Sequence, residues 1–317
     1  MPDKNIKEIE SESGGSSYHI PVLLKESVDA LNINPSGVYV DCTFGGGGHA
    51  REILSRLNKD GRLYAFDQDE DARANLPTDD RLIFIPHNFR HLSRFLRLHK
   101  VLAVDGILAD LGVSSHQFNE PSRGFSIRFD APLDMRMDKS AEKTAADLLK
   151  EKSAEQLQHI FQEYGEVTNS KTLALLLADH TKHAPIKTIN DLKSTISSVV
   201  KGNPNRYFAQ VFQALRMAVN EETASLLDLL EQSAGLLKPG GRFSIITFHS
   251  IEDRIVKNFF RQGSQLEISR DPIYGIKLEP PFEPLFKKPI EPSPEETKRN
   301  PRSRSARLRV GVRKNEE

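Results

Sequence analysis

Short apolar runs alternate along this chain with longer segments in which apolar residues recur every three or four positions. The runs are rich in Val, Ile, Leu and Phe, as buried parallel strands are, and they span 38–40, 62–66, 81–85, 104–110 and 242–248. Helical periodicity follows the first run at 50–57 and flanks the last run at 222–237 and 251–260. The alternation predicts a parallel sheet with helices on its faces, the Rossmann-like α/β fold.

The connection between the fourth and fifth predicted strands is far longer than a crossover helix requires. Helical periodicity through most of it predicts an inserted all-helical domain at 131–219. We therefore expect a disordered leader at 1–17 and an α/β domain built from 18–130 and 220–317. The last helix of the insert, 207–219, leaves Arg216 beside the predicted cleft and has a predicted buried face of Phe208, Val211, Phe212, Leu215 and Val219.

Four glycines, Gly45–Gly48, stand between the first predicted strand and the helix behind it. This strand, glycine loop and helix form the first half of a nucleotide-binding βαβ unit, in which bare backbone lies against the ligand. The second strand ends at Asp67, where a carboxylate is placed to accept both hydroxyls of a ribose. The alternative is a loop that binds no ligand, but it does not explain why a strand, a glycine loop, a helix, a second strand and an acid follow one another in this order.

The same glycines match the dinucleotide pattern GxGxxG/A, with Ala50 as the last position, so a nicotinamide dehydrogenase is one alternative. Asp41, at the end of the first strand, favours S-adenosylmethionine instead. A carboxylate there repels a pyrophosphate but attracts a cationic methionyl amine. The run from Asp41 to Gly48 also resembles the first motif of Rossmann-like methyltransferases.

Further candidate residues follow the other strand ends, where ligands of open α/β sheets bind. Phe89 follows the third strand and is a candidate to pack on an adenine, although a tucked-in loop aromatic is the equal alternative. Asp110 ends the fourth strand, at the predicted point of methyl transfer. Asp134-Met-Arg136-Met-Asp138 reads as a lid or substrate loop, with a solvated charged loop as the alternative.

Composition narrows the choice of chemistry. The 317 residues carry no net charge, yet Lys298 to Lys314 holds eight basic residues and no acid, which favours contact with a polyanion. The stretch 263–301 predicts loops with one or two short edge strands, and 306–312 predicts a strand. Cys42 is the single cysteine and lies in the first strand and loop. A disulfide, a thiolate zinc site and covalent methylation of a pyrimidine C5 are therefore disfavoured.

No apolar run approaches the roughly 20 residues of a membrane span, and the amino terminus lacks the apolar core of a signal peptide. We expect a cytoplasmic protein.

Several stretches together resemble one family: HIPVLLKESV, DCTFGGGGHA, DGILADLGVSS, RGFS, PLDMRMD, FQALRMAVNEE, LKPGGRFSIITFHSIEDRIVK and NPRSRSARLR. From about His19 to Val312 the chain is similar to the bacterial RsmH (MraW) methyltransferases. These enzymes methylate N4 of a cytidine in the decoding site of 16S ribosomal RNA. The resemblance implies a class I methyltransferase sheet, S-adenosylmethionine as cofactor, and 16S rRNA, within the small ribosomal subunit, as partner.

Carried over by position, the resemblance implies seven cofactor contacts: Gly47, Gly48, His49, Asp67, Phe89, Asp110 and Gln117. Asp110 is the first candidate to accept a hydrogen from the target amine, with Asp134 and Asp138 as alternates. The predicted substrate-binding residues are Arg136, Arg216, Arg302, Arg304 and Arg307. A methyltransferase for another rRNA or tRNA nucleotide, and a non-catalytic ribosome-assembly factor, remain as further alternatives.

Overall fold

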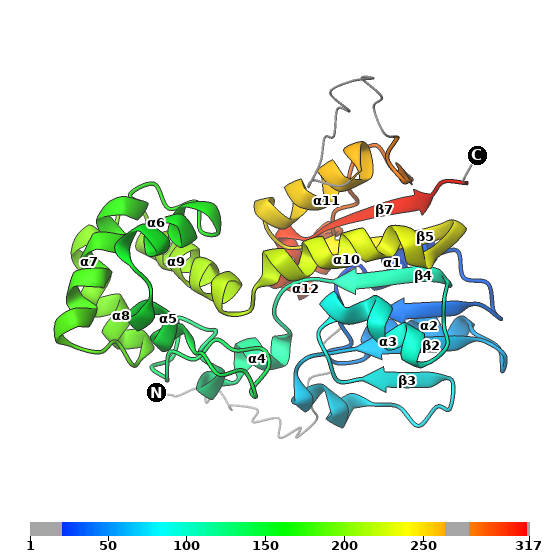
Figure 1. Cartoon of the computed structure of the whole chain (residues 1–317), viewed down its shortest axis with the longest axis horizontal. Helices are drawn as coiled ribbons and strands as arrows, with labels where there is room; N and C mark the ends of the chain where they lie inside the picture. Colours follow the sequence, from blue (N-terminus) through cyan, green and yellow to red (C-terminus); the bar gives the residue numbers. More distant parts are fainter. Residues whose placement is uncertain (1–20, 264–278, 316–317) are drawn as a thin grey trace, which may run out of the picture.

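A computed structural model describes residues 21–263 and 279–315, so the predicted leader 1–17 lies outside the described residues. Its strands form one sheet in the order β3-β2-β1-β4-β5-β7-β6 (Figure 1). The strands are β1 (Val38–Asp41), β2 (Arg62–Phe66), β3 (Leu82–Ile85), β4 (Val104–Asp110), β5 (Leu237–Thr247), β6 (Phe282–Pro284) and β7 (Arg307–Arg313). The first five are parallel, β7 is antiparallel to β5, and β6 is antiparallel to β7. The predicted α/β sheet is confirmed.

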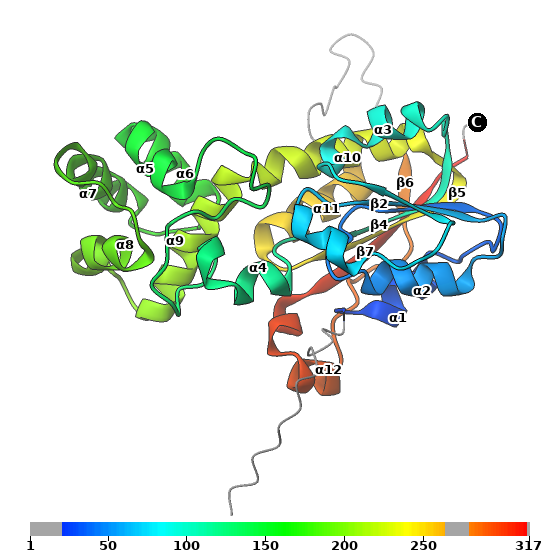
Figure 2. The same cartoon turned by 90° about the horizontal axis from the view of Figure 1, so that it is seen from below.

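Alternate residues of the central strands pack on opposite faces of the sheet, because strand side chains alternate with a period of two. Val40 and Ile107 face one cluster, which includes apolar residues of α3 (Leu92–Leu98), α10 (Glu222–Leu236) and α11 (Ser250–Gln262). Tyr39 and Leu108 face a second cluster with α1 (Leu24–Ala30) and α2 (Gly48–Arg56). Figure 2 shows these two helix layers on either side of the sheet. Strands buried on both faces explain the continuous apolar runs.

Residues 125–219 form what we call the helical lobe, which stands beside the sheet (Figure 1). Its helices are α5 (Ala145–Glu151), α6 (Ala154–Glu163), α7 (Ser170–His183), α8 (Ile189–Ile196) and α9 (Pro204–Val219). Thr144, Ser153 and Thr188 each begin a helix with a reciprocal capping box, which satisfies backbone N–H groups of the first turn. The lobe has an apolar cluster of its own, distinct from the two that flank the sheet.

Arg123, at the end of η3 (Pro121–Arg123), joins the lobe to the sheet. Its side chain is 6% exposed, and the guanidinium donates to Asp69 at 2.7 Å and to Asp71 at 3.1 Å, in the segment after β2. The other terminal nitrogen donates to the carbonyl oxygens of Arg136 and Met137 in the lobe, at 3.0 and 2.9 Å. One buried side chain therefore fixes both parts.

Three details differ from the sequence predictions. Phe208 and Val219 are only partly buried, whereas Val211, Phe212 and Leu215 of the predicted face of α9 are buried together with Tyr207, Ala214 and Met217. Strand β5 begins at Leu237, ahead of the apolar run predicted as a strand at 242–248, and so includes the residues between that run and α10. The stretch 263–301 contains, besides β6, the helix α12 (Pro294–Arg299). Ser293 caps that helix and a proline begins it, a signal that the sequence does carry.

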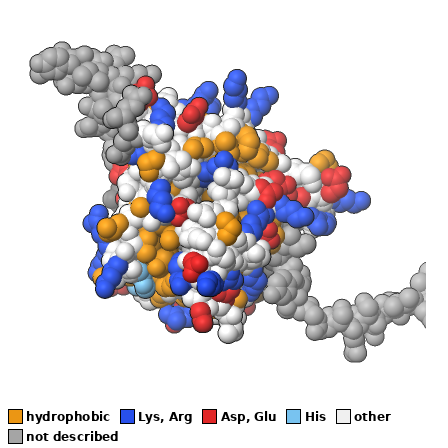
Figure 3. All heavy atoms as spheres, turned by 90° about the vertical axis from the view of Figure 1, so that its right-hand side faces the viewer, with side chains coloured by type: hydrophobic (Ala, Val, Ile, Leu, Met, Phe, Trp, Pro, Cys, Tyr) orange, Lys and Arg blue, Asp and Glu red, His pale blue; other side chains and the backbone are white. Residues whose placement is uncertain are grey.

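In the described part of the chain, no helix is both long enough and apolar enough to span a membrane. Figure 3 shows the face turned away from the helical lobe, where basic, acidic and apolar side chains are interspersed. No single sign of charge dominates that face, so it offers no obvious footprint for a polyanion.

Arg123→Met should destabilise the protein by about 3–5 kcal/mol, because it leaves Asp69 buried without its cationic partner. Arg254→Met is the matched control, since Arg254 is exposed and pairs with Glu166 at 3.6 Å. An exposed pair contributes about 0–1 kcal/mol. Urea unfolding monitored by circular dichroism measures both variants, and equal effects would contradict the bridging role of Arg123.

Candidate cofactor and substrate site

A cavity of about 1550 Å³ opens at the carboxyl ends of β1, β2, β4 and β5. Five of the seven predicted cofactor residues line it: His49, Asp67, Phe89, Asp110 and Gln117. They come from five different segments, which meet because the carboxyl ends of parallel strands share one edge of the sheet. The convergence supports the sequence reasoning, although it does not by itself assign each residue a role.

The glycine loop faces the cavity with Gly45 and Gly46, not with the predicted Gly47 and Gly48. Gly45 has a φ of +49° and Gly47 a φ of +73°, values that favour glycine. A Cβ at Gly46 would meet no atom within 4 Å, whereas a Cβ at Gly48 would lie 2.0 Å from Pro21 Cγ. Gly46 thus leaves open space for a ligand, and Gly48 lets the first turn of α2 pack on Pro21.

Asp67 joins the glycine loop to the segment after β2. One carboxylate oxygen accepts from Gly45 N at 2.7 Å and the other from Asp69 N at 2.8 Å. Burial raises the pKa of Asp67 to about 6. Each oxygen keeps a further lone pair, so the carboxylate, already oriented by backbone, can still accept from two hydroxyls.

Asp110 presents a partly buried side chain to the cavity. Its Oδ1 has no hydrogen-bond partner, and its Oδ2 lies 3.8 Å from His49 Nδ1. Burial lowers the pKa of His49 to about 4, so the imidazole is neutral and this contact is not an ion pair. Burial, with Asp41 and Glu252 nearby, raises the pKa of Asp110 well above its usual range. A buried, unpaired carboxylate oxygen is costly and is suited to a cationic ligand.

Asp41 does not line the cavity, although its place in the sequence had suggested that its carboxylate attracts the cationic amine of the cofactor. Its side chain is fully buried, with Oδ1 accepting from Thr43 N at 3.0 Å and Oδ2 unpaired. Asp110 is the acid that lines the cavity. Asp41 lies outside the cavity wall, and its charge helps to raise the pKa of Asp110.

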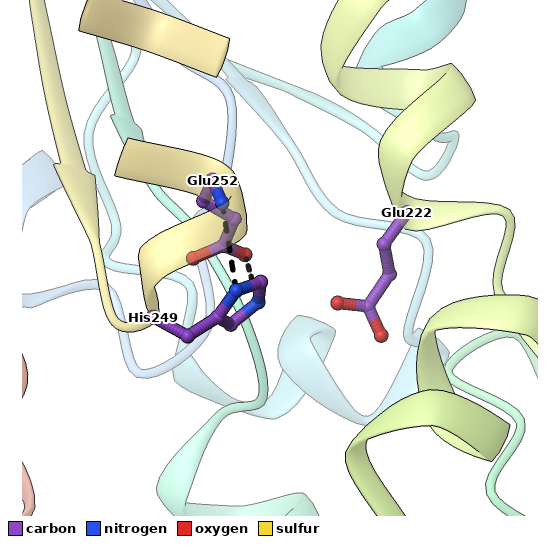
Figure 4. A group of neighbouring side chains, drawn as sticks. All are labelled: Glu222, His249 and Glu252. Atoms are coloured by element: carbon purple, nitrogen blue, oxygen red, sulfur yellow. Dashed lines mark hydrogen bonds and ion pairs between the residues drawn. The ribbon is translucent and has the colours of Figure 1, made fainter. Parts of the chain in front are cut away.

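A second charged cluster lies beside Asp110, and the sequence reasoning pointed only to its arginine, Arg216. This guanidinium donates to both oxygens of Glu222, at 2.8 and 2.9 Å, and both residues line the cavity. Figure 4 shows the acidic side of the cluster, where Glu252 Oε1 lies 3.2 Å from Nε2 of His249. Burial raises the pKa of Glu252, but His249 and Arg216 outweigh it, and the pKa lies below its usual value.

Glu222, His249 and Glu252 bring three potential metal ligands within 4.8 Å of one another. Arg216 already supplies a cation to Glu222, and Glu252 Oε2 accepts from Phe248 N at 3.0 Å. The cluster is therefore balanced by its own arginine and backbone, and we assign no metal to it. The motif FHSIEDR was the signal in the sequence that could have indicated this cluster. It places two acidic side chains in the first turn of a helix whose buried face is mostly apolar.

The remaining predicted residues fall into two groups. Asp134, Arg136 and Asp138 do not line the cavity. Arg136 is bound to Asp134 at 2.7 Å and to the carbonyl of Ala141 at 2.6 Å, and Asp138 accepts from Ser140. The loop thus holds itself together, and the catalytic and substrate roles predicted for it receive no support from this arrangement.

Of the predicted tail arginines, Arg302 lines the cavity mouth. Arg304 is exposed outside it, and Arg307 pairs with Asp253 at 3.1 Å. Their predicted contacts with RNA stay predictions.

A parallel sheet with an antiparallel β7 between β5 and β6, a glycine loop after β1 and an acid after β2 define the class I methyltransferase fold. Within that class, the chain belongs to the MraW methylase family, which it matches over residues 16–314.

Relatives support the same assignment. The ribosomal RNA small subunit methyltransferase H of Cytophaga hutchinsonii is 54% identical over 93% of this chain and 99% of its own length. The protein of that name from Flavobacterium johnsoniae is 50% identical, over 92% of this chain and 97% of its own. A crystal structure of an rRNA methylase from Streptococcus thermophilus covers 94% of this chain and 99% of its own at 11% identity. Its TM-score of 0.41 is too low to compare sites.

Asp41 is buried with one carboxylate oxygen unpaired, so we expect the protein to lose stability as the pH rises and this carboxyl ionises. Burial raises the pKa of Asp41 to about 7. A carboxyl whose folded pKa lies above its unfolded value of about 3.9 stabilises the fold at low pH and loses that contribution as the pH rises. The stability difference between Asp41→Asn and the parent should therefore shift in favour of the variant by about 2–4 kcal/mol as the pH is raised from about 4 to about 8. Unfolding free energies at several pH values test this, and a difference independent of pH would contradict it.

Proposed function

We propose that this protein transfers a methyl group from S-adenosylmethionine to N4 of a cytidine in 16S ribosomal RNA. Membership of the MraW methylase family and the names of the close relatives support a small-subunit rRNA substrate. The choice of N4 rests on the sequence resemblance to the RsmH (MraW) enzymes. The observation that carries the proposal is the position of Asp110, which ends β4 at the wall of the cavity.

The residues of the cavity fit this cofactor. Asp67 would hold the ribose hydroxyls, and Phe89, which lines the cavity from η2 (Phe89–His91) after β3, would pack on the adenine. Gly45 and Gly46 would let the ligand approach the backbone. Asp110 would face the positive charge that S-adenosylmethionine carries. When bound, the cofactor supplies an electrophilic methyl group on a sulfonium sulfur.

Asp110 would also act on the substrate amine. The lone pair of the cytosine amine is delocalised into the ring, so an acceptor for one of its hydrogens raises the electron density on nitrogen. The raised pKa of Asp110 in the protein alone favours the protonated acid. A cation in the cavity lowers a neighbouring carboxyl pKa, so a bound cofactor would favour the ionised form of Asp110, which accepts hydrogen bonds.

The size of the cavity supports room for a substrate base as well. Sites for a single small ligand commonly measure about 300–1,000 Å³, whereas this cavity measures about 1550 Å³. A target base must leave its stack to reach a methyl donor. Arg216, partly buried at the cavity wall and held by Glu222, would present a planar donor group to that base.

We further propose that the helical insert predicted at 131–219 is a substrate-recognition domain, and that Arg302, Arg304 and Arg307 contact phosphates. The helical lobe has its own apolar core, which supports the proposal that it is a separate structural unit. Its loop residues also form part of the cavity wall, through Met137 and Arg128. The rRNA would be met within the small ribosomal subunit, in the cytoplasm.

Asp67→Ala should weaken binding of S-adenosylmethionine about tenfold or more, because the charge-assisted hydrogen bonds to the ribose disappear. Isothermal titration calorimetry measures the affinity. Asp60→Ala, an exposed carboxylate outside the cavity, is the control and should bind as the parent does. Unchanged affinity of a folded Asp67→Ala protein would refute the ribose role.

The reaction product tests the proposed atom. Small-subunit rRNA treated with the protein and S-adenosylmethionine should yield N4-methylcytidine on digestion and mass spectrometry. Asp110→Asn, which keeps the size of the side chain, should lower the rate at least about a hundredfold if it removes an essential acceptor. A product of 5-methylcytidine or a 2′-O-methyl nucleoside would overturn the function, whereas full activity of Asp110→Asn would remove only the role of Asp110.

A further inference from the structure

Two arginines share one aromatic ring at the mouth of the cavity. The guanidinium carbon of Arg302, in η5 (Pro301–Ser305), lies 4.7 Å from the ring centre of Phe118, in α4 (Ser115–Asn119). That of Arg128 lies 5.4 Å from the same centre and 5.8 Å from the centre of Phe129. Figure 2 shows α4 beside the C-terminal segment, and Arg302 donates to Asn119 Oδ1 at 2.6 Å. We call Phe118, Arg128, Phe129 and Arg302 the mouth cluster.

The two positive charges of the mouth cluster have no negative partner among the described residues. Arg302 donates to an amide oxygen, and Arg128 Nε lies 3.3 Å from the hydroxyl oxygen of Ser126. The other arginines deep in the cavity differ, because Arg123 and Arg216 are paired with carboxylates. Burial and the nearby Arg128 lower the pKa of Arg302. Two cations held on one ring without a counter-charge repel each other, and an anion between them removes that cost.

The nearest acids in the sequence are engaged elsewhere. Glu120 accepts from the hydroxyl of Ser122 at 2.8 Å, and Asp130 accepts from Asn190 N at 3.1 Å. Neither acid forms an ion pair with Arg128 or Arg302 in the described part of the chain, so the site is open to an anion supplied by a ligand.

Phe129 adds an exposed aromatic surface to this charge. It is 43% exposed, one of only five large apolar side chains with such exposure in the described chain. Exposed phenylalanine beside arginine is typical of proteins that bind single-stranded nucleic acid, where bases stack on rings and guanidinium groups hold phosphates. Duplex RNA hides its base faces, so an exposed ring at this position suits an unpaired strand.

We infer that the mouth cluster is a nucleotide clamp for the single strand next to the target base, with a phosphate between Arg128 and Arg302 and a base on Phe129. The inference rests on the proposed function, because it assumes an RNA substrate. Arg128 and Phe129 come from the loop of the helical lobe, whereas Arg302 comes from the C-terminal segment, so a bound strand would bridge the two parts. The clamp also explains how a target base is held at a cavity that opens between them.

The test measures binding of the full-length protein, with S-adenosylhomocysteine present, to a fluorescent single-stranded RNA and to a duplex of the same sequence. Phe129→Leu should lower affinity for the single strand about tenfold, because one base no longer stacks on the ring. The double change Arg128→Gln and Arg302→Gln should flatten the plot of log affinity against log salt by about 0.7 for each phosphate that is no longer bound. Duplex affinity should change less in both variants.

The controls match each change in chemistry and exposure. Phe286→Leu alters an aromatic residue that is 40% exposed and does not line the cavity. Arg97→Gln alters an exposed arginine near the end of α3, also outside the cavity. Both should bind as the parent does.

The outcomes separate the clamp from the proposed function. Cluster variants that bind the single strand as the controls do, while the parent still methylates rRNA, would overturn the clamp alone. Equal decreases in affinity for single strand and duplex would also overturn it, since they would indicate general charge attraction. A parent protein that methylates no rRNA would instead refute the proposed function, whatever its affinity for the probe.

Discussion

The hydrogen bond from Gly45 N to Asp67 is the interaction on which the rest of the site depends. It ties the loop after β1 to the end of β2 at 2.7 Å. Two residues later, Asp69 is buried and accepts from Gln117 and from Arg123, each at 2.7 Å. Arg123 in turn binds carbonyl oxygens of the helical lobe. A single chain of hydrogen bonds to carboxylates thus runs from the glycine loop through Asp67 and Asp69 to the lobe, so the geometry of the loop and the geometry of the lobe are set together.

The free-energy cost of this arrangement comes mainly from two carboxylates near the glycine loop. Asp41 and Asp110 each keep a buried oxygen without a partner, and both have raised pKa values because burial disfavours their charge. A folded protein tolerates such groups mainly where function requires them. A ligand with positive charge lowers the penalty, which links the cost of burying these carboxylates to affinity for a sulfonium cofactor. Deeper in the same cavity, Arg216 neutralises Glu222 internally.

The sequence predicted the sheet because each central strand is buried on both faces and appears as an apolar run. It also brought Asp67, Phe89 and Asp110 together, since parallel strands end at one edge. Contacts between distant segments were beyond its reach. Nothing local indicates that Arg123 would bind Asp69, 54 residues away. Arg136 is a different case, because its partner Asp134 lies two residues away in the same motif, and both residues had been predicted to be open to substrate. Gly45 lines the cavity whereas Gly48 packs on Pro21, a contact that no spacing reveals.

The central claim is that this cavity methylates N4 of a cytidine in 16S rRNA. The most direct test is mass spectrometry of 16S rRNA from cells that lack the gene for this protein, compared with the parent strain and with cells in which the gene is restored. We expect one N4-methyl group on a cytidine to disappear in the deletion strain and to return with the gene. Identical rRNA modification in all three strains would contradict it.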